Sequence, residues 1–250
     1  MTNGWALDGV LWFAVFATVF FAALIRALTG WAFSILCVPL LSLCLDPSTA
    51  IVLTLLLALA ATGKNLKGIG SQVQMGTFVP ILVSGMLGVP LGYGIHQGLP
   101  TATLRLMMGF LVVALSLAMA LIRSHPRPLS RGWLLAAGLA SGVMGGLFGI
   151  AGPPVVLLFL ATATDMREAR ATLGLGLFVV SGLAVLFYSV GGYVDGHVLL
   201  LALLAMPAVL GGDTLGNRLF NRFPKLAFKG LSVAVTCGVG LVNLGLAFRG

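Results

Sequence analysis

Charge is scarce in this chain of 250 residues: Asp, Glu, Lys and Arg together make up 8% of it, and six residues are acidic. Soluble domains have about 25% of their residues charged, so this chain lacks a polar exterior that could face water. The acidic residues and the three histidines are scattered, and they form no HExxH motif, nucleophile–base set or carboxylate cluster. The sequence therefore argues against an enzyme, and it predicts no catalytic residue, cofactor or metal site.

Cysteine is also rare. The three cysteines lie inside apolar segments, and their odd number and their spacing argue against a disulfide framework or a zinc site. Residues 1–9 contain no Lys or Arg, whereas a signal peptide begins with a positively charged region. The first apolar run is therefore expected to remain in the protein as a membrane segment.

Hydrophobic residues are abundant instead, at 59% of the chain. In a bilayer the backbone polar groups must find partners within the protein, and helices achieve this within one segment. The net charge of +8 does not indicate a nucleic-acid partner, because the basic residues lie between apolar runs, as in the cytoplasmic loops of membrane proteins. The predicted fold class is an all-α integral membrane protein that crosses the inner (plasma) membrane several times, in contact with lipid.

One block of glycine, proline and basic positions occurs twice at the same internal spacing, 124 residues apart. Its positions are Gly88, Gly92, Pro100 and Arg105 in the first copy and Gly212, Gly216, Pro224 and Lys229 in the second. Many secondary transporters consist of two such repeats with the substrate site between them. The duplication predicts a first repeat over residues 1–124, a cytoplasmic linker over 125–131 and a second repeat over 132–250.

Each repeat divides into five apolar segments. They cover 10–28, 31–44, 49–63, 75–96 and 101–122 in the first repeat, and 132–148, 153–164, 169–188, 197–220 and 224–248 in the second. The second segment of each repeat is short: at about 1.5 Å per residue, 31–44 reaches about 21 Å of a bilayer core about 30 Å thick. Short segments interrupted by glycine or proline, in matching places of two repeats, indicate a transport site.

The distribution of charge predicts the orientation of the repeats. If the first two segments of each repeat form a hairpin that returns to its own side, most of the 14 basic residues fall on the cytoplasmic face, as the positive-inside rule requires. The second repeat is then inverted relative to the first, and both termini lie outside. The alternative, two parallel halves of four spans, would place the basic cluster at 218–229 on the outer face.

The richest motif is GGLFGIAGPP at 145–154, ahead of the short segment of the second repeat. Glycine permits a tight turn and proline favours the first turn of a helix, so a helix is predicted to begin near Pro153 after an unwound tip. A helix start presents unpaired amide groups and partial positive charge, which suit an anion. The candidates are Gly149, Gly152, Pro153 and Pro154; the alternative is a tight helix crossing without a ligand.

The matching stretch of the first repeat aligns Gly30 with Gly146 and Pro39 with Pro154. It has fewer glycines, but Ser34 has a hydroxyl that can donate a hydrogen bond to an oxyanion. Trp31 is a further candidate, for which space filling is the alternative role.

The glycine-rich tip that ends in proline, present twice, resembles the TauE/SafE family of membrane anion transporters. The turns Asp46…Ala50 and Asp165…Ala169 and the repeated glycine–proline–basic blocks fit the same resemblance, which covers about residues 10–248. The resemblance implies transport of sulfite, of organosulfonates such as sulfoacetate, or of related sulfur compounds. It also implies tip positions for Gly30, Pro39, Gly146, Gly149, Gly152 and Pro154.

Arg26 lies inside an apolar run, four residues before Gly30. Charges within the membrane are costly and usually face a cavity or a partner, and a planar guanidinium suits a sulfonate or carboxylate. Snorkelling of the side chain to the headgroups is the alternative.

Lys64, Asn65 and Asp213 are candidates for a gate or for coupling. Lys64 and Asn65 end a segment near the inner face, where loop polarity is the plainer interpretation. Asp213 is either a proton carrier or the ion-pair partner of Arg218, which lies a little more than one helical turn further along; the ion pair is the preferred interpretation.

These features predict a secondary transporter that moves small anions by alternating access, and a passive anion channel is the alternative. Assembly as a homodimer is compatible with the sequence, which does not determine the oligomeric state. The candidate substrate-binding residues are Arg26, Gly30, Trp31, Ser34, Gly149, Gly152, Pro153 and Pro154.

Overall fold

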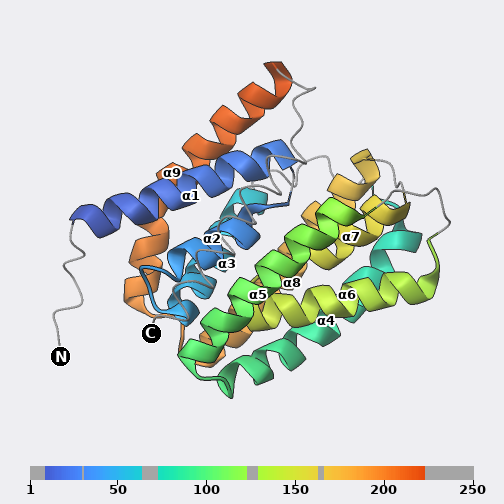
Figure 1. Ribbon diagram of the computed structural model, residues 1–250, viewed down its shortest axis with the longest axis horizontal. Coiled ribbons are helices and arrows are strands. Elements are labelled where there is room, and N and C mark those ends of the chain that lie inside the picture. Colours follow the sequence, from blue (N-terminus) through green and yellow to red (C-terminus); the bar gives the residue numbers. More distant parts are fainter. Residues whose placement is uncertain (1–8, 30, 64–72, 123–128, 163–165, 223–250) are drawn as a thin grey trace.

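The computed structural model describes residues 9–29, 31–63, 73–122, 129–162 and 166–222, and this part of the chain is helical without strands (Figure 1). The helices are α1 (Gly9–Thr29), α2 (Phe33–Leu41), α3 (Pro47–Gly63), α4 (Met75–Gln97), α5 (Thr101–Leu121), α6 (Arg131–Phe148), α7 (Gly152–Thr162), α8 (Met166–Val190) and α9 (Gly196–Arg222). Each predicted segment up to residue 222 corresponds to one helix. The predicted segment 224–248 lies outside the described residues.

Four of the described helices are long and apolar enough to cross a membrane: α4, α5, α8 and α9. Their outer faces carry large apolar side chains, among them Leu87, Leu121 and Leu203, each more than 60% exposed. Such faces suit lipid rather than water. The chain is thus an all-α integral membrane protein, as its composition predicted.

Helices α2 and α7 are short, as the sequence predicted. They contain 9 and 11 residues, so they extend about 14 and 17 Å at about 1.5 Å per residue. Neither could cross the hydrocarbon core, which is about 30 Å thick. Each follows a longer helix after a short non-helical connection, which we call a helix break: α2 follows α1, and α7 follows α6.

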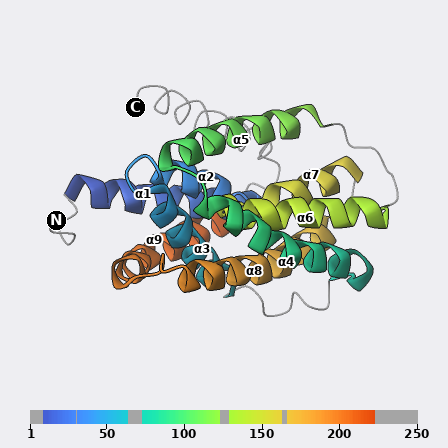
Figure 2. The same cartoon turned by 90° about the horizontal axis from the view of Figure 1, so that it is seen from below.

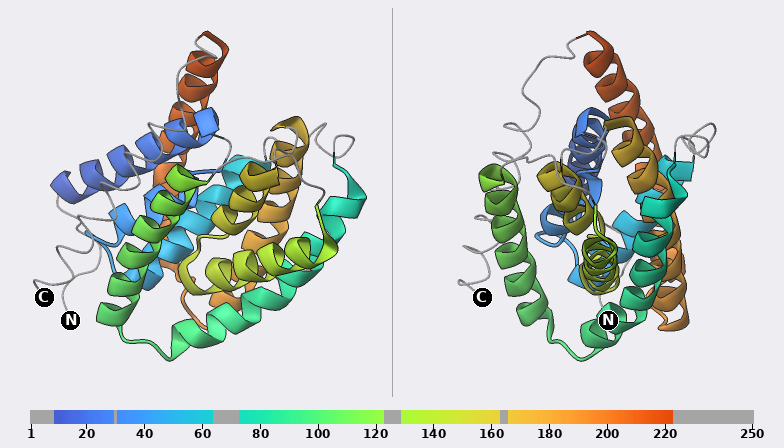
Figure 3. Two further views of the ribbon diagram at one scale, coloured as in Figure 1. Left: turned by 45° about the vertical axis from the view of Figure 1, so that its right-hand side comes forward. Right: turned by 90° about the vertical axis from the view of Figure 1, so that its right-hand side faces the viewer.

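The repeated glycines form the two closest helix contacts of the described fold. Gly88 and Gly92 of α4 lie against the backbone of α6, whereas Gly212 and Gly216 of α9 lie against the backbone of α1. Figures 1 and 3 show both pairs side by side. Small residues allow helices in membranes to approach to backbone contact, so each copy of the repeated block performs the same packing role on a different partner.

The two glycine-packed pairs join the predicted repeats. In each pair the residue numbers rise together along the contact, so the helices run in the same direction: Gly88 meets Leu139 and Gly92 meets Val143, and Gly212 meets Phe20 and Gly216 meets Leu24.

Helices α1 and α6, which open the two predicted repeats, run in opposite directions in Figures 1 and 2. The boundaries of the repeats, their inverted relation and the homodimer stay predictions.

Candidate functional site

The break between α6 and α7 is built by glycine. Gly149 ends α6 with φ 68°, a left-handed conformation that residues other than glycine rarely adopt. Its amide donates to Gly145 O (3.0 Å), and the Ile150 amide donates to Met144 O (3.3 Å), so the last carbonyls of α6 are satisfied. Helix α7 begins at Gly152, which confirms the helix start that the sequence predicts near Pro153.

Side chains from three helices hold this break in place. Ser141 Oγ donates to the carbonyl oxygen of Ala151, and Tyr188 Oη donates to Gly146 O at 3.0 Å. His96 Nδ1 lies 3.1 Å from Leu147 O. The sequence analysis did not single out these residues, because a buried polar side chain on α4 or α8 gives no sign of which loop it will contact.

The break between α1 and α2 provides more amide donors than the second break. Ala32 precedes α2 and makes no side-chain cap hydrogen bond, and the first amides of a helix have no acceptor within it. Phe33, Ser34 and Ile35 all carry such an amide, whereas Pro153 and Pro154 have none. The glycine content pointed to the second tip, yet its two prolines remove donors from the start of α7.

The two breaks face each other across a small cavity of about 50 Å³, which has room for a few water molecules or one small solute. A methyl group placed on Gly152 would lie 3.7 Å from Trp31 O, so the tips are nearly in contact. The polar side chains that line the cavity are Arg26, Ser34, Thr62 and Ser181. The remaining lining residues are Trp31, Phe33, Ile35, Ala58, Ile150, Ala151, Gly152, Pro153, Gly174 and Leu177.

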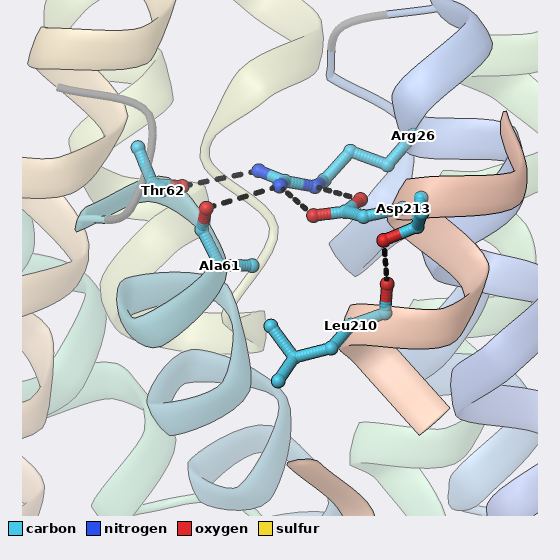
Figure 4. Close-up of polar contacts among 6 residues, drawn as sticks. Arg26, Ala61, Thr62, Leu210 and Asp213 are labelled. Carbon is cyan, nitrogen blue, oxygen red and sulfur yellow. Dashed lines mark hydrogen bonds and ion pairs between the residues drawn. The ribbon is translucent and has the colours of Figure 1, made fainter. Parts of the chain in front are cut away.

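Arg26 is the cation of this cavity, and Figure 4 shows it between α3 and α9. Its Nη2 lies 2.7 Å from Asp213 Oδ2 and its Nε 3.4 Å from Oδ1. Nη1 donates to Thr62 Oγ1 and Nη2 to Ala61 O, both at 3.2 Å. The guanidinium is thus held in the protein interior, with its side chain 14% exposed, instead of extending to the headgroups.

Asp213 pairs with Arg26 and not with Arg218, the partner that was preferred from the sequence. Its side chain is 6% exposed, whereas Arg218 lies on the exposed side of α9. The reason is tertiary: Gly212 brings α9 against the backbone of α1 and so places the carboxylate beside the guanidinium of Arg26.

The structure brings most of the predicted site residues together. Arg26, Trp31, Ser34, Gly152 and Pro153 line the one cavity. Gly149 is buried and shapes the turn, and Pro154 is half-buried in the first turn of α7.

Three further candidates, Gly30, Lys64 and Asn65, lie outside the described residues. Two other residues at the cavity were not predicted from the sequence. Thr62 and Ser181 are the polar lining residues that were missed, since isolated hydroxyls within apolar helices are usually bonded to their own backbone. Among the described residues, no three His, Cys, Asp or Glu side chains gather as a metal site.

A helical membrane protein with two interrupted helices that meet at a polar cavity has an architecture found among secondary transporters. The chain belongs to the family described as "Sulfite exporter TauE/SafE", whose sequence profile matches residues 15–242. The resemblance seen in the tip motifs is therefore confirmed.

Two curated relatives show detectable identity. Over 141 residues the chain is 29% identical to the "Probable sulfite/organosulfonate exporter TauE" of Cupriavidus necator, in an alignment that covers 55% of this chain and 54% of the relative. Over 112 residues it is 30% identical to the "Probable inner membrane transporter protein TsaS" of Comamonas testosteroni, with 44% and 47% covered. The chain thus aligns with about half the length of these relatives. No solved structure matches it.

Proposed function

We propose that the protein is a secondary transporter of small oxyanions, with sulfite and organosulfonates as the leading substrates, in the inner membrane. The observation that carries this proposal is that the cation Arg26 and the start of α2, with its unpaired amides, line one cavity between two interrupted helices. A planar guanidinium and a helix N-terminus both favour an anion with several oxygen atoms. The names of the two relatives support the choice of sulfur compounds as substrates and of the inner membrane as the location.

We further propose that the repeats over 1–124 and 132–250 are inverted and that the site is exposed to each side in turn. The opposite directions of α1 and α6 support an inverted pair (Figure 1). The glycine contacts suggest which bodies move: α1 with α9 forms one unit and α4 with α6 the other, because backbone packing of this kind leaves little room for sliding. The moving units thus differ from the sequence halves. The cavity is lined by Arg26 of α1, from one unit, and by Ile150 and Ala151, which directly follow α6 of the other.

The direct test is uptake by proteoliposomes that contain the purified full chain. We expect saturable uptake of radiolabelled sulfite and sulfoacetate that thiosulfate inhibits, and no inhibition by neutral or cationic solutes. Empty liposomes are the control. Saturation distinguishes a carrier from the alternative, a passive anion channel, whose flux would rise linearly with concentration. Binding of cations or neutral solutes alone would contradict the proposal.

Gly152 provides a matched pair of variants for the same assay. A methyl group at this position meets Leu177 and Trp31 at 3.7 Å, an ordinary contact, so Gly152→Ala should fold and transport. The longer side chain of Gly152→Leu must enter the space between these residues and fill the cavity, and we expect it to reduce uptake at least about tenfold. Equal uptake by the two variants would exclude the cavity as the substrate site.

The inverted arrangement is tested by cysteine labelling at Gly9, the first residue of α1, and at Gly132, the second residue of α6. Both are exposed and have open space around them. In a background without the three native cysteines, a reagent that does not cross the membrane should label Gly9→Cys and Gly132→Cys from opposite sides. Labelling from the same side would require parallel halves.

The same positions, together with Gly76 at the start of α4, test the moving units by spin labelling. The distance between labels at 76 and 132 should stay constant when substrate is added, and the distance between 9 and 132 should change. The opposite pattern would contradict the assignment of the two units.

A further inference from the structure

We infer that Asp213 and the transported anion compete for Arg26, so that anion binding is coupled to uptake of a proton by Asp213. The inference rests on the proposed function, because the competing anion is the substrate of the cavity described above. In the anion-free state, the carboxylate of Asp213 binds the guanidinium that the substrate binds when it enters.

The guanidinium has little spare capacity in this conformation. It carries five N–H donors, of which two bind the carboxylate of Asp213, one binds Thr62 and one binds Ala61. The described residues supply no acceptor for the remaining N–H on Nη1. An oxyanion that binds Arg26 through two parallel hydrogen bonds therefore has to take contacts that Asp213 now makes.

Within the described structure, Arg26 is the one cation paired with Asp213. Helices α1 and α3 pack on α9; Arg26 is the charged or titratable side chain that α1 presents, and α3 has none. On α9 itself, Arg218 lies on an exposed face, His197 is more than four turns away from Asp213, and Arg222 is the last residue of the helix, nine residues further along. The whole Asp213 residue is 4% exposed, so its carboxylate is removed from bulk water.

A buried carboxylate that loses its counter-ion becomes neutral by taking up a proton, because an unpaired charge is costly in an apolar interior. Before binding, the site holds one positive and one negative charge. After one anionic group of the substrate binds, the guanidinium pairs with that group and the carboxylate of Asp213 has become a carboxylic acid. One anionic group has replaced the carboxylate as the partner of Arg26, and one proton has entered with it.

The coupling has a defined sign. The anion-bound state holds more protons than the anion-free state, so the affinity for the anion rises as pH falls, by up to about tenfold for each pH unit. On a membrane with a proton gradient, anion and proton would therefore move in the same direction.

The test measures proton uptake by the purified full chain in weakly buffered detergent solution with a pH-indicator dye. The probe is sulfoacetate, because its sulfonate and carboxylate both stay ionised between about pH 6 and 8 and exchange no protons themselves. We expect about one proton to be taken up for each anion bound, as determined by parallel titration calorimetry.

Two variants isolate the carboxylate. Asp213→Asn keeps the side-chain shape but cannot titrate, so it should bind sulfoacetate more tightly at neutral pH, without proton uptake and with a flat pH profile. Asp195→Asn is the control: Asp195 Oδ1 accepts from the Val198 amide at the start of α9, a capping role that Asn also fills. Its proton uptake should equal that of the wild type.

The outcomes separate the two proposals. Anion binding by the wild type without proton uptake would overturn the competition, and so would an unchanged pH profile in Asp213→Asn, while the transport function would stand. Failure of the wild type to bind sulfite, thiosulfate or sulfoacetate would overturn the proposed function and this inference with it. The measurement on the wild type decides the inference even if Asp213→Asn does not fold.

Discussion

Arg26→Ala is expected to reduce anion uptake in proteoliposomes to the level of empty vesicles. The variant removes the cation that lines the cavity and leaves only amides and hydroxyls to bind the anion. It also leaves the buried carboxylate of Asp213 without its partner. Removing one member of a buried ion pair typically destabilises a protein by about 3–5 kcal/mol, so uptake has to be interpreted together with the amount of folded protein.

A double variant separates these two effects. In Arg26→Ala/Asp213→Ala both charges are absent, so the thermal unfolding temperature in detergent should recover most of the loss seen in Arg26→Ala. Uptake should stay absent, because the cation is still missing. Restored uptake in the double variant would show that Arg26 only neutralises Asp213 and does not bind substrate. Arg26→Lys should transport poorly even when folded, since an ammonium group cannot reproduce the planar contacts of Arg26.

Gly92→Ala is expected to break the packing of α4 on α6 and to destabilise the protein by about 2–4 kcal/mol. The added methyl group would overlap the carbonyl oxygen of Val143 and lie 2.8 Å from the backbone nitrogen of Leu147. Both obstacles belong to the backbone of α6, so no side chain can rotate away and the helices have to separate. The measurement is the unfolding temperature of the purified protein in detergent.

Gly94→Ala, two residues further along the same helix, is the matched control. A methyl group there meets nothing within 4 Å, and alanine has a higher helix propensity than glycine by about 1 kcal/mol. Gly94→Ala should therefore melt at the wild-type temperature or slightly above it. Equal destabilisation by the two substitutions would mean that general helix properties, and not the α4–α6 contact, explain the effect.

The positions of the helices could be predicted largely from the sequence, because hydrophobic run length and the punctuation by glycine and proline are local properties. The α6–α7 break illustrates this: Gly149, Gly152 and Pro153 determine the turn and the helix start through their own backbone chemistry. The same local chemistry has a second consequence at this tip, because prolines that start a helix well also lack the amide donors that bind an anion.

The candidate site was predicted in part. Arg26, Trp31, Ser34, Gly152 and Pro153 were identified because a charge, a break or a hydroxyl is unusual within an apolar run, and the structure gathers all five around one cavity. Thr62 and Ser181 were not identified, because their importance depends on which helices become neighbours.

The sequence by itself determined the membrane class, the duplicated glycine block and the two interruptions, because composition, spacing and backbone preference do not depend on distant contacts. Only the tertiary structure decided that Asp213 would neutralise Arg26 across 187 residues of chain. From the sequence we preferred Arg218, a little more than one turn further along the same helix, but side-chain pairs on an exposed helix surface contribute only a few tenths of a kcal/mol. Burial decided otherwise, because a charge removed from water has to be paired by whichever opposite charge the packing brings beside it.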